Sequence, residues 1–499
     1  MYFKIKSNII NRNYGSFGYI TDNRNYGYKK ADNTDNDIGD KIVSQSGAIF
    51  LSALRQKAQH IDSIIENITK RFENIDTKIL YKDAIEFYSM LEEDGFIVSG
   101  ETLSECDKKD SKFLYKMLKS GFKINNCHPK TKSNKKTQDF LDQYFNGEPQ
   151  LTNLHMEITS KCNERCVHCY IPNDKKVSQI ETGLFYNILK QCREMNLLHL
   201  TISGGEPMLH KNFINFLKKC NEYNLSVNIL SNLTLLNKEI IEEMKMNGLL
   251  GVQVSLYSMT PQIHDSITQL EGSFELTKNA ILKLKENDVP LQISCPIMKQ
   301  NKNSYTDVLN WAKTHNIHVG CDYVLIGKCD HTTQNLKSRL SISDIKKVIE
   351  NKIKEEPEYL DRIKSDSEEK KQNTPNDIVC SICHSSICIG DNGNVYPCAG
   401  WQSYVVGNAN QTYLREIWNN SPKIRYLRGL RKKDFPKCIH CLDKDYCTMC
   451  MVRNANEHPF GDPLVVNDFF CKIARLNKEM VENKAKHLCT GQQISHETI

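Results

Sequence analysis

The sequence predicts an α/β protein built around a partial (β/α)6 barrel of the TIM type, with a small α+β domain before the barrel and a cysteine-rich domain after it. Between residues 151 and 330, six short apolar segments alternate with amphipathic stretches, which is typical of βα units around a parallel sheet. The cysteines are clustered, since three of the 20 lie at 162–169 and ten follow residue 379. With 499 residues the chain is long enough for about three domains of ordinary size.

Composition and charge exclude two classes of partner. Lysine and arginine number 66 against 60 acidic residues, a net charge of +6, so bulk charge does not indicate a nucleic-acid partner. No apolar stretch approaches the roughly 20 residues of a membrane span, and the first ten residues lack the pattern of a secretory signal. We therefore expect a cytoplasmic protein with neither nucleic acid nor membrane as partner, whose thiols serve as metal ligands.

The first 105 residues predict the small α+β domain. Aromatic and β-branched residues at 15–30 flank a turn signal at Thr21–Asn25, which favours a short hairpin, and Phe96–Val98 is typical of a closing strand. Between them lie helical stretches whose apolar residues repeat at helical spacing, namely Ile61, Ile64, Ile65, Ile68, Ala84, Phe87, Tyr88 and Leu91. Residues 106–150 predict a lysine-rich linker, which is either a solvated connector or a segment that attracts an acidic partner.

The remaining boundaries follow from the apolar pattern. Within the barrel region, 151–330, the expected strands are 154–159, 199–203, 226–230, 251–256, 291–297 and 318–325. In such barrels the chemistry lies at the carboxyl ends of the strands, and the barrel motifs described below lie at such ends. A charged helical bridge is expected at 331–379, a cysteine-rich domain stabilised by metal at 380–475, and a tail at 476–499.

Three cysteines follow the first barrel strand with the spacing Cys162-x3-Cys166-x2-Cys169. Three thiolates on one tight loop suit an iron–sulfur cluster, and a four-iron cluster held by three cysteines keeps one iron open for a small molecule. The alternative is a zinc knuckle in which His168 joins the three cysteines.

A second motif, Gly204-Gly205-Glu206-Pro207, follows the second strand. Together with the cysteine spacing and the adjacent Tyr170, it resembles the radical S-adenosylmethionine (SAM) superfamily, in which the open iron of a 4Fe-4S cluster chelates SAM. The resemblance implies that the glycine backbone and the glutamate carboxylate approach the amino group of the methionine moiety. It also implies SAM contacts at the next strand ends, although capping would equally explain those residues, Ser231, Asn232 and Ser255. By the same resemblance, the segment 264–274 shapes the barrel behind SAM.

The cysteine-rich region resembles the SPASM domain, which carries two auxiliary 4Fe-4S clusters in peptide-modifying radical SAM enzymes. The resemblance rests on Gly393–Cys398, Gly407–Asn408, Ile417–Trp418 and the cysteine spacings, with the departure that only two residues separate Cys447 from Cys450. It implies one cluster on Cys438, Cys441, Cys447 and Cys471, and a second on Cys398, Cys450 and two of Cys380, Cys383 and Cys388. The sequence does not choose that pair, and a pair of structural zinc sites is the alternative.

The N-terminal domain resembles the winged-helix-like recognition element of enzymes that modify ribosomally synthesised peptides. That resemblance implies capture of the leader segment of a precursor peptide by β-augmentation beside the hairpin, which raises the local concentration of the core peptide at the barrel. A winged helix that binds DNA is the alternative, although no basic recognition helix stands out at 61–72.

Together the resemblances imply a radical SAM maturase that cleaves SAM reductively to a 5'-deoxyadenosyl radical, with electrons from a donor such as flavodoxin or ferredoxin. Thioether formation between a cysteine sulfur and a carbon of the peptide, as in sactipeptides, is the leading hypothesis. Epimerisation, carbon–carbon or carbon–oxygen crosslinking, and sulfatase-type formylglycine formation are the alternatives, and an iron–sulfur redox sensor on DNA is the alternative from another class. No catalytic residue is assigned beyond the cluster ligands, since alternation cannot decide whether Asp322 or Tyr323 faces the barrel interior.

Overall fold

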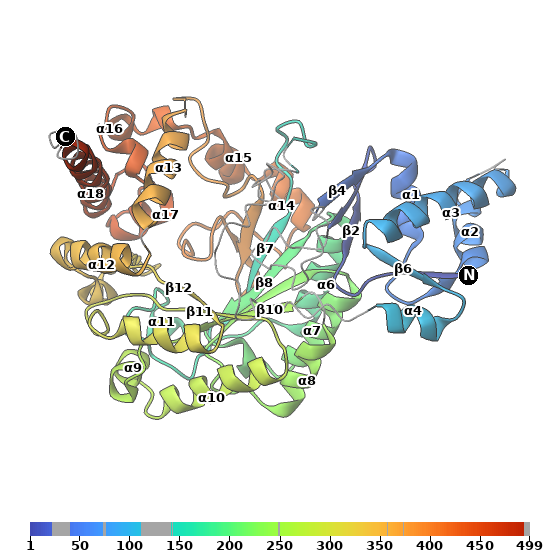
Figure 1. Ribbon diagram of the computed structural model, residues 1–499, viewed down its shortest axis with the longest axis horizontal. Helices are drawn as coiled ribbons and strands as arrows, with labels where there is room; N and C mark the ends of the chain where they lie inside the picture. The colour runs from blue at the N-terminus through green and yellow to red at the C-terminus, as the bar shows by residue number, and fades with distance from the viewer. Residues whose placement is uncertain are drawn as a thin grey trace, which may run out of the picture.

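A central parallel sheet organises the computed structural model, which describes residues 1–21, 40–72, 76–110, 141, 143–247, 250–356, 358–372 and 374–493 (Figure 1). Its strands follow the order β12-β11-β10-β9-β8-β7, with every neighbouring pair parallel, so the sheet is an open, partial barrel. Among the described helices, none is long and apolar enough to cross a membrane. The strands are β7 (Asn153–Thr159), β8 (His199–Gly204), β9 (Ser226–Ser231), β10 (Leu250–Ser255), β11 (Leu291–Ser294) and β12 (His318–Gly320).

The last two barrel strands are shorter than the sequence predicted. Pro296 lacks a backbone N–H, so regular pairing of β11 cannot continue through it. Single hydrogen bonds still hold the two chains together beyond the strands, from Cys295 N–H to the Gly320 carbonyl (2.9 Å) and from Ile297 N–H to the Asp322 carbonyl (2.7 Å).

Alternation along β7 separates the two faces of the sheet. Leu154, Met156 and Ile158 are buried in the main hydrophobic core, whereas His155 and Glu157 point to the opposite face. The connecting helices cover the outer face (Figure 1), which leaves polar side chains inside the partial barrel. These helices are α6 (Thr182–Glu194), α7 (Phe213–Glu222), α8 (Lys238–Met246), α9 (Pro261–Thr268), α10 (Ser273–Glu286) and α11 (Tyr305–Thr314).

The cysteine-rich region extends the barrel sheet, a connection that the sequence did not predict. Strand β13 (Ser386–Ile389) pairs in parallel with β7, with Ser386 opposite Asn153, and continues through β14 (Asn394–Tyr396) and β15 (Gly407–Asn408). The strand pairing therefore joins this region directly to the strand that leads into Cys162.

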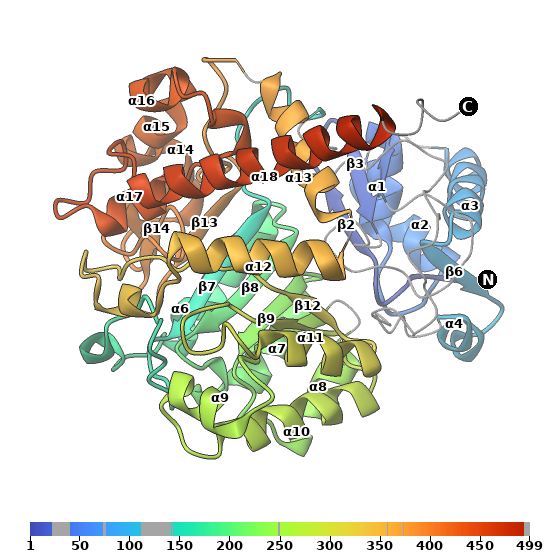
Figure 2. The same ribbon diagram turned by 60° about the vertical axis from the view of Figure 1, so that its left-hand side comes forward.

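Two long helices lead from the barrel to the cysteine-rich region, as the sequence predicted for the charged bridge. These helices, α12 (Ile342–Glu355) and α13 (Tyr359–Lys371), pack against α18 (Asp468–Gln493), and Figure 2 shows α12 and α18 crossing the front of the molecule. The expected tail, 476–499, belongs up to Gln493 to helix α18. The other helices of this region are α14 (Leu414–Asn420), α15 (Pro422–Gly429), α16 (Pro436–Ile439) and α17 (Met451–Glu457).

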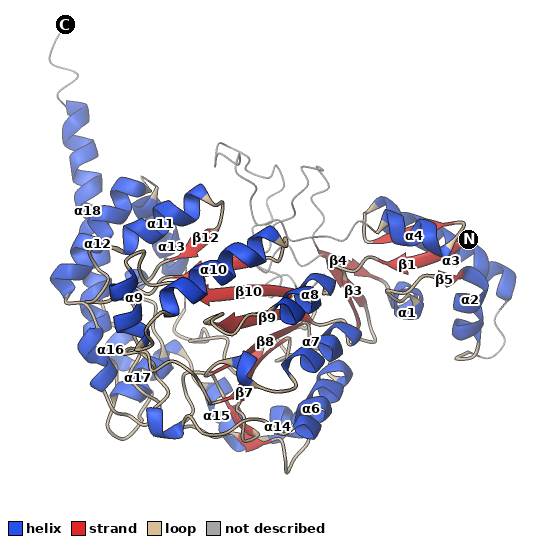
Figure 3. Ribbon diagram, turned by 90° about the horizontal axis from the view of Figure 1, so that it is seen from below, coloured by secondary structure: helices blue, strands red, loops and turns tan. Residues whose placement is uncertain are grey.

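The N-terminal residues form two small antiparallel sheets and four helices at one end of the molecule (Figure 3). One sheet has the order β5-β1-β6 and the other β2-β3-β4. The first half of the expected hairpin at 15–30 contains β3, which pairs with both β2 and β4, and the second half lies outside the described part, since residues 22–39 are not described. The elements are β1 (Tyr2–Ile5), β2 (Ile10–Asn13), β3 (Gly18–Thr21), β4 (Asp40–Val43), α1 (Gln45–Ala53), β5 (Gln59–His60), α2 (Ile61–Thr69), α3 (Thr77–Glu93), β6 (Ile97–Gly100) and α4 (Leu103–Lys109).

A buried arginine fixes the N-terminal region to the barrel. Arg12 is 1% exposed and donates from Nε to the Leu197 carbonyl (2.8 Å) and from Nη2 to the Asn224 carbonyl (2.7 Å). Asn224 in turn donates from Nδ2 to the Ile9 carbonyl (2.8 Å). Leu197 and Asn224 precede β8 and β9, so the N-terminal region contacts the amino ends of the barrel strands, opposite the face that carries the cysteine motif.

Candidate functional site

The loop after β7 brings Cys162, Cys166 and Cys169 to the carboxyl end of the sheet. The Glu164 N–H donates to Cys162 Sγ (3.4 Å), and Cys166 Sγ donates to Glu164 Oε2 (3.2 Å). Burial raises the pKa of Cys162 to about 11 and that of Cys166 well above its usual range. These two free thiols are therefore neutral, and binding of a metal must release their protons.

His168, next to Cys169 in the loop, packs against Tyr257. Its Nε2 lies 3.5 Å from the Tyr257 hydroxyl, and the two rings meet edge to face with centroids 5.2 Å apart. Burial lowers the pKa of His168 to about 4, so the ring is neutral at physiological pH.

Two glycines let the second strand end pack directly on the cysteine loop. A Cβ on Gly204 would lie 1.9 Å from the Thr159 carbonyl oxygen, and a Cβ on Gly205 would lie 2.2 Å from that of Lys161. Backbone hydrogen bonds hold the contact, from Gly205 N–H to Thr159 (2.7 Å) and from Glu206 N–H to Lys161 (2.8 Å). Only glycine permits this approach of two backbones.

Glu206 joins two strand ends, those of β8 and β9, from a fully buried position. Its Oε1 accepts from the Ser231 hydroxyl (2.8 Å) and the Met208 N–H (3.0 Å), and its Oε2 accepts from the Asn232 N–H (2.8 Å). Burial raises the pKa of Glu206 to about 7, and these hydrogen bonds partly oppose that rise. The carboxylate therefore fixes the Gly204–Pro207 turn against the end of β9, a role that the sequence did not predict.

The other residues expected to contact SAM lie around this turn. Asn232 donates from Nδ2 to Asn163 Oδ1 (3.0 Å) and so ties the end of β9 to the cysteine loop. Ser231 is buried, and Ser255 is half-buried at the end of β10. In the segment 264–274, Asp265 accepts from the Gly272 N–H (2.8 Å) and the Phe274 N–H (2.9 Å). These two hydrogen bonds fix the start of α10.

Tyr170 links the cysteine loop to the cysteine-rich region through a buried glutamate. The Tyr170 hydroxyl donates to Glu157 Oε1 (2.7 Å), and Gln402 donates from Nε2 to Glu157 Oε2. Burial raises the pKa of Glu157 to about 7. Sequence reasoning missed Glu157, whose only signal was an acidic residue at an inward position of an otherwise apolar strand.

A cavity of about 960 Å³ contains most of the second cysteine set. It lies against α13, α16, α17 and α18, and Cys450 lies at one side of it. Burial, with smaller contributions from the neighbouring thiols, raises the pKa of Cys438 to about 11. The cysteines that line the cavity are Cys438, Cys441, Cys447, Cys450 and Cys471.

A further group of thiols lies between this cavity and the barrel. Burial, with a smaller contribution from the charge of Cys380, raises the pKa of Cys383 to about 12 and that of Cys398 to about 11. The charge of Cys450 also contributes at Cys398. Cys388 lies on β13 and is completely buried, and its nearest charged neighbours are Glu157 and Cys398. The first four thiols therefore form one neighbourhood, with Cys388 toward the barrel interior.

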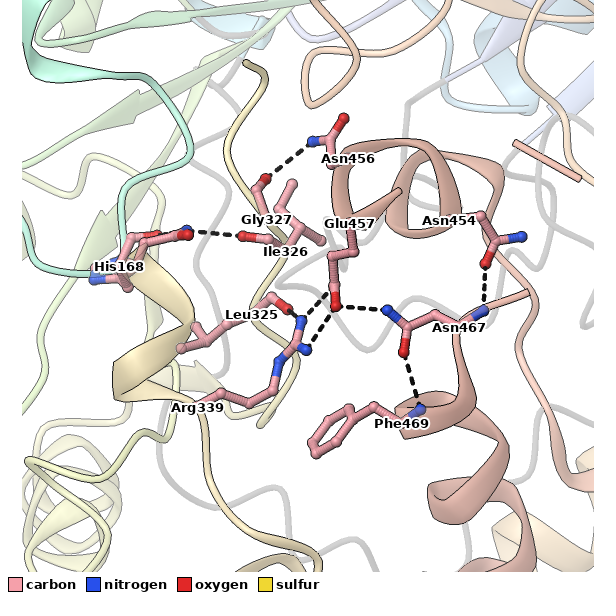
Figure 4. A network of polar contacts seen from close by, with 11 residues as sticks. His168, Leu325, Ile326, Gly327, Arg339, Asn454, Asn456, Glu457, Asn467 and Phe469 are labelled. Atoms are coloured by element: carbon pink, nitrogen blue, oxygen red, sulfur yellow. Dashed lines mark hydrogen bonds and ion pairs between the residues drawn. The ribbon is translucent and has the colours of Figure 1, made fainter. Parts of the chain in front are cut away.

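A buried polar network connects the end of the barrel to α17, the helix that follows Cys450 (Figure 4). Arg339 donates from Nη1 to Glu457 Oε2 (2.8 Å), and both side chains are 9% exposed. Asn456 donates from Nδ2 to the Gly327 carbonyl (3.0 Å), and Asn335 donates from Nδ2 to the His168 carbonyl (3.1 Å). The cysteine loop and the cysteine-rich region therefore share one set of contacts.

The structure separates the two candidate residues after the last barrel strand. Asp322 is exposed and lines a cavity of about 250 Å³ together with Gln253, Gln292 and Ser294, whereas Tyr323 is buried in the main core. Cys321 lines the same cavity. Sequence reasoning could not separate these neighbours, because the chain is no longer a regular strand there.

The fold and the cysteine loop define an iron–sulfur enzyme of the α/β partial-barrel class. Residues 156–312 match the radical SAM superfamily, and residues 380–442 match the SPASM iron–sulfur cluster-binding domain. The chain therefore carries a radical SAM domain and a SPASM domain, in place of the zinc alternatives. Its cofactors are SAM and 4Fe-4S clusters.

Relatives with similar sequences differ in the reactions that their names describe. The AdoMet-dependent heme synthase of Methanosarcina barkeri is 25% identical over 60% of this chain and 90% of its own length. The antilisterial bacteriocin subtilosin biosynthesis protein AlbA of Bacillus subtilis is 24% identical over 63% of this chain and 70% of its own length. The fold is similar to that of Streptococcus suis SuiB bound to its precursor peptide SuiA, with a TM-score of 0.57 and 16% identity over 93% of this chain and all of that one.

The residues present fit these cofactors. Three soft thiols lie on one loop, and an N–H group already points at Cys162 Sγ. Beside them, Glu164 Oε1 and His168 Nδ1 are buried without a hydrogen-bond partner among the described residues, so polar atoms remain available next to the cysteines. A methionine amino group of SAM is the kind of donor that a buried carboxylate oxygen accepts.

Proposed function

We propose that the protein is a maturase of a ribosomally synthesised peptide and that it forms a thioether between a cysteine sulfur and a peptide carbon. The observation that carries the proposal is the combination, in one chain, of the Cys162–Cys169 loop at the open barrel, a cysteine-rich region paired to β7, and an N-terminal region with an edge strand. Subtilosin biosynthesis protein AlbA and SuiB, crystallised with its precursor peptide SuiA, support a peptide substrate.

The proposed roles of the site residues follow from their contacts. Cys162, Cys166 and Cys169 would hold the cluster, which with SAM supplies a 5'-deoxyadenosyl radical that abstracts hydrogen from the peptide. Gly204 and Gly205 bring backbone groups close to the cysteine loop, and Tyr170 excludes water on the side of Glu157. Around SAM we assign further contacts to Glu206, Pro207, Ser231, Asn232 and Ser255.

The auxiliary sites are assigned by neighbourhood. We assign Cys438, Cys441, Cys447 and Cys471 to one cluster, because all four line one cavity large enough for it. For the second cluster we favour Cys380, Cys383, Cys398 and Cys450, whose thiols are electrostatically coupled. Cys388 is then the spare thiol. In thioether formation, one of these clusters would accept the electron left after sulfur–carbon bond formation.

We assign capture of the leader segment to the N-terminal region, as a winged-helix-like element spanning residues 1–105. Strand β4 pairs with β3 on one side and with no other strand among the described residues, so an extended peptide can add beside Lys41–Val43. Because this region contacts the amino ends of the barrel strands, the bound peptide must cross the length of a six-residue strand, about 20 Å, to reach the cysteine loop.

Mass analysis of a precursor peptide produced together with the enzyme tests the proposal. A thioether removes two hydrogens per link, and fragmentation locates the sulfur–carbon bond. The matched control is the variant Cys162→Ala/Cys166→Ala/Cys169→Ala, which should leave the peptide unmodified and form no 5'-deoxyadenosine. An unchanged mass with altered stereochemistry would mean epimerisation, and a two-hydrogen loss without a sulfur link would mean carbon–carbon or carbon–oxygen crosslinking.

The remaining alternatives give different results in the same preparations. A sulfatase-type maturase would convert one cysteine or serine of its substrate into an aldehyde, which carbonyl reagents detect. A DNA-bound redox sensor would bind duplex DNA with an affinity that falls steeply with salt and would cleave no SAM.

A further inference from the structure

The cavity that contains Cys438 to Cys471 is surrounded by positive charge. Eight lysines and arginines line it against three aspartates, an excess of five positive charges in a chain whose net charge is only +6. The eight are Lys370, Lys432, Lys437, Lys444, Arg453, Lys472, Arg475 and Lys478. We call this set the basic rim.

Part of the basic rim is already neutralised within the chain. Asp443 accepts ion pairs from Arg475 (3.2 Å) and Lys478 (3.4 Å), and Asp468 pairs with Lys437. Three other members, Lys370, Lys444 and Lys472, form no ion pair with any described residue. Lys444 and Lys472 are exposed, so these cations are available to an external partner.

Exposed apolar side chains lie within the basic rim. Leu442, next to Cys441, is 85% exposed, and Ile378 is 43% exposed, and both line the cavity. An apolar centre inside a ring of like charges is the arrangement of a protein–protein interface that selects its partner by charge.

We propose that the basic rim is the docking surface for a small acidic one-electron carrier protein, such as a flavodoxin. The inference rests on the proposed function, since the partner is recognised by its position over the cysteines that would hold an auxiliary cluster. On docking, the apolar centre would exclude water while the lysines pair with carboxylates of the carrier. The reduced carrier loses one electron and the enzyme gains it, with no bond formed or broken.

Binding of an acidic flavodoxin to the reconstituted full-length enzyme tests the docking surface. We expect the variant Lys370→Glu/Lys444→Glu/Lys472→Glu to raise the Kd by about tenfold or more at low salt. The matched control is Lys238→Glu/Lys283→Glu/Lys313→Glu, three exposed lysines on α8, α10 and α11, which should change the Kd by less than about twofold. Raising the salt from about 50 mM to about 200 mM should weaken wild-type binding and affect the rim variant much less.

Equal effects of the two triple variants, or salt-independent binding, would overturn the proposal. So would loss of precursor-peptide binding with intact flavodoxin binding, because the surface would then belong to an acidic peptide. Formation of 5'-deoxyadenosine with dithionite as reductant distinguishes failure of the docking surface from failure of the proposed function. The rim variant should form it at the wild-type rate. Its absence from wild type would refute the proposed function and not the docking surface. If the triple variant loads no iron, Lys472→Glu alone, on the exposed face of α18, should still raise the Kd severalfold.

Discussion

Replacement of Gly205 by alanine tests whether the contact between two backbones builds the SAM site. The new Cβ would lie 2.2 Å from the Lys161 carbonyl oxygen and 2.5 Å from that of Ser160. Because a relaxed carbon–oxygen contact is about 3.3 Å, the two segments must separate by about 1 Å. Both contacted oxygens belong to backbone in the loop that leads into Cys162, so no side chain can rotate away.

The separation has a predictable cost. The backbone hydrogen bonds from Gly205 to Thr159 (2.7 Å) and from Glu206 to Lys161 (2.8 Å) lie on this contact, and loss of each costs about 1 kcal/mol. A displacement of about 1 Å between reacting groups lowers a rate by about 100-fold. We therefore expect Gly205→Ala to lower dithionite-driven 5'-deoxyadenosine formation by about that factor while the protein still folds and loads iron.

The matched control is Gly183→Ala. Gly183 lies on α6, and a Cβ there would meet nothing within 4 Å. Alanine favours a helix over glycine by up to about 1 kcal/mol, so this variant should be as stable as wild type or more stable, with unchanged SAM cleavage. A Gly205→Ala enzyme with SAM affinity and cleavage rate within about threefold of wild type would refute the reasoning.

Three further predictions concern buried polar groups. Arg339→Met should destabilise the protein by about 3–5 kcal/mol, because it leaves Glu457 buried without its cation. In urea unfolding of the reconstituted protein, the double variant Arg339→Met/Glu457→Leu should lose less free energy of unfolding than the single variant. A double variant as unstable as the single one would contradict this. Cys383→Ser should reduce bound iron by one cluster, whereas Cys388→Ser should not, and equal iron losses would contradict the assignment. Burial raises the pKa of Glu206 from 4.5 to about 7, so the folded state binds the extra proton and its stability falls as pH rises between these two values. Over that range, iron-free wild type should lose on the order of 3 kcal/mol of unfolding free energy relative to Glu206→Gln. A constant difference between the two proteins across the range would contradict this.

Local signals in the sequence predicted the barrel and the position of its motifs. Alternating apolar residues such as Leu154, Met156 and Ile158 identify β7 without knowledge of its neighbours, and the motif residues follow strand ends by simple counting. The same reasoning predicted the helices that begin at Ile61 and Thr77, because each buries one apolar face.

Contacts between distant segments had no such signal. The pairing of β13 with β7 joins residues more than 200 positions apart, and the short segment Ser386–Ile389 contains no pattern that predicts its partner strand. The sequence neighbours of Arg12 are polar, as is usual for a surface segment. Only the fold reveals that Arg12 is buried against Leu197. The link from Glu206 to Ser231 had no signal for the same reason, since Ser231 lies on another strand.

The pairing of β13 with β7 also explains why the SAM site and the cysteine-rich region form one unit. Neighbouring strands lie about 4.8 Å apart and resist shear through their ladder of hydrogen bonds. β7 leads through Thr159 into the cysteine loop, and Cys388 on β13 lies opposite His155 on β7. The Tyr170–Glu157–Gln402 contacts cross the same boundary inside the barrel, and the Arg339–Glu457 pair crosses it outside. Movement of one cysteine set relative to the other would have to break all three connections, so the fold holds the two sets at a fixed separation.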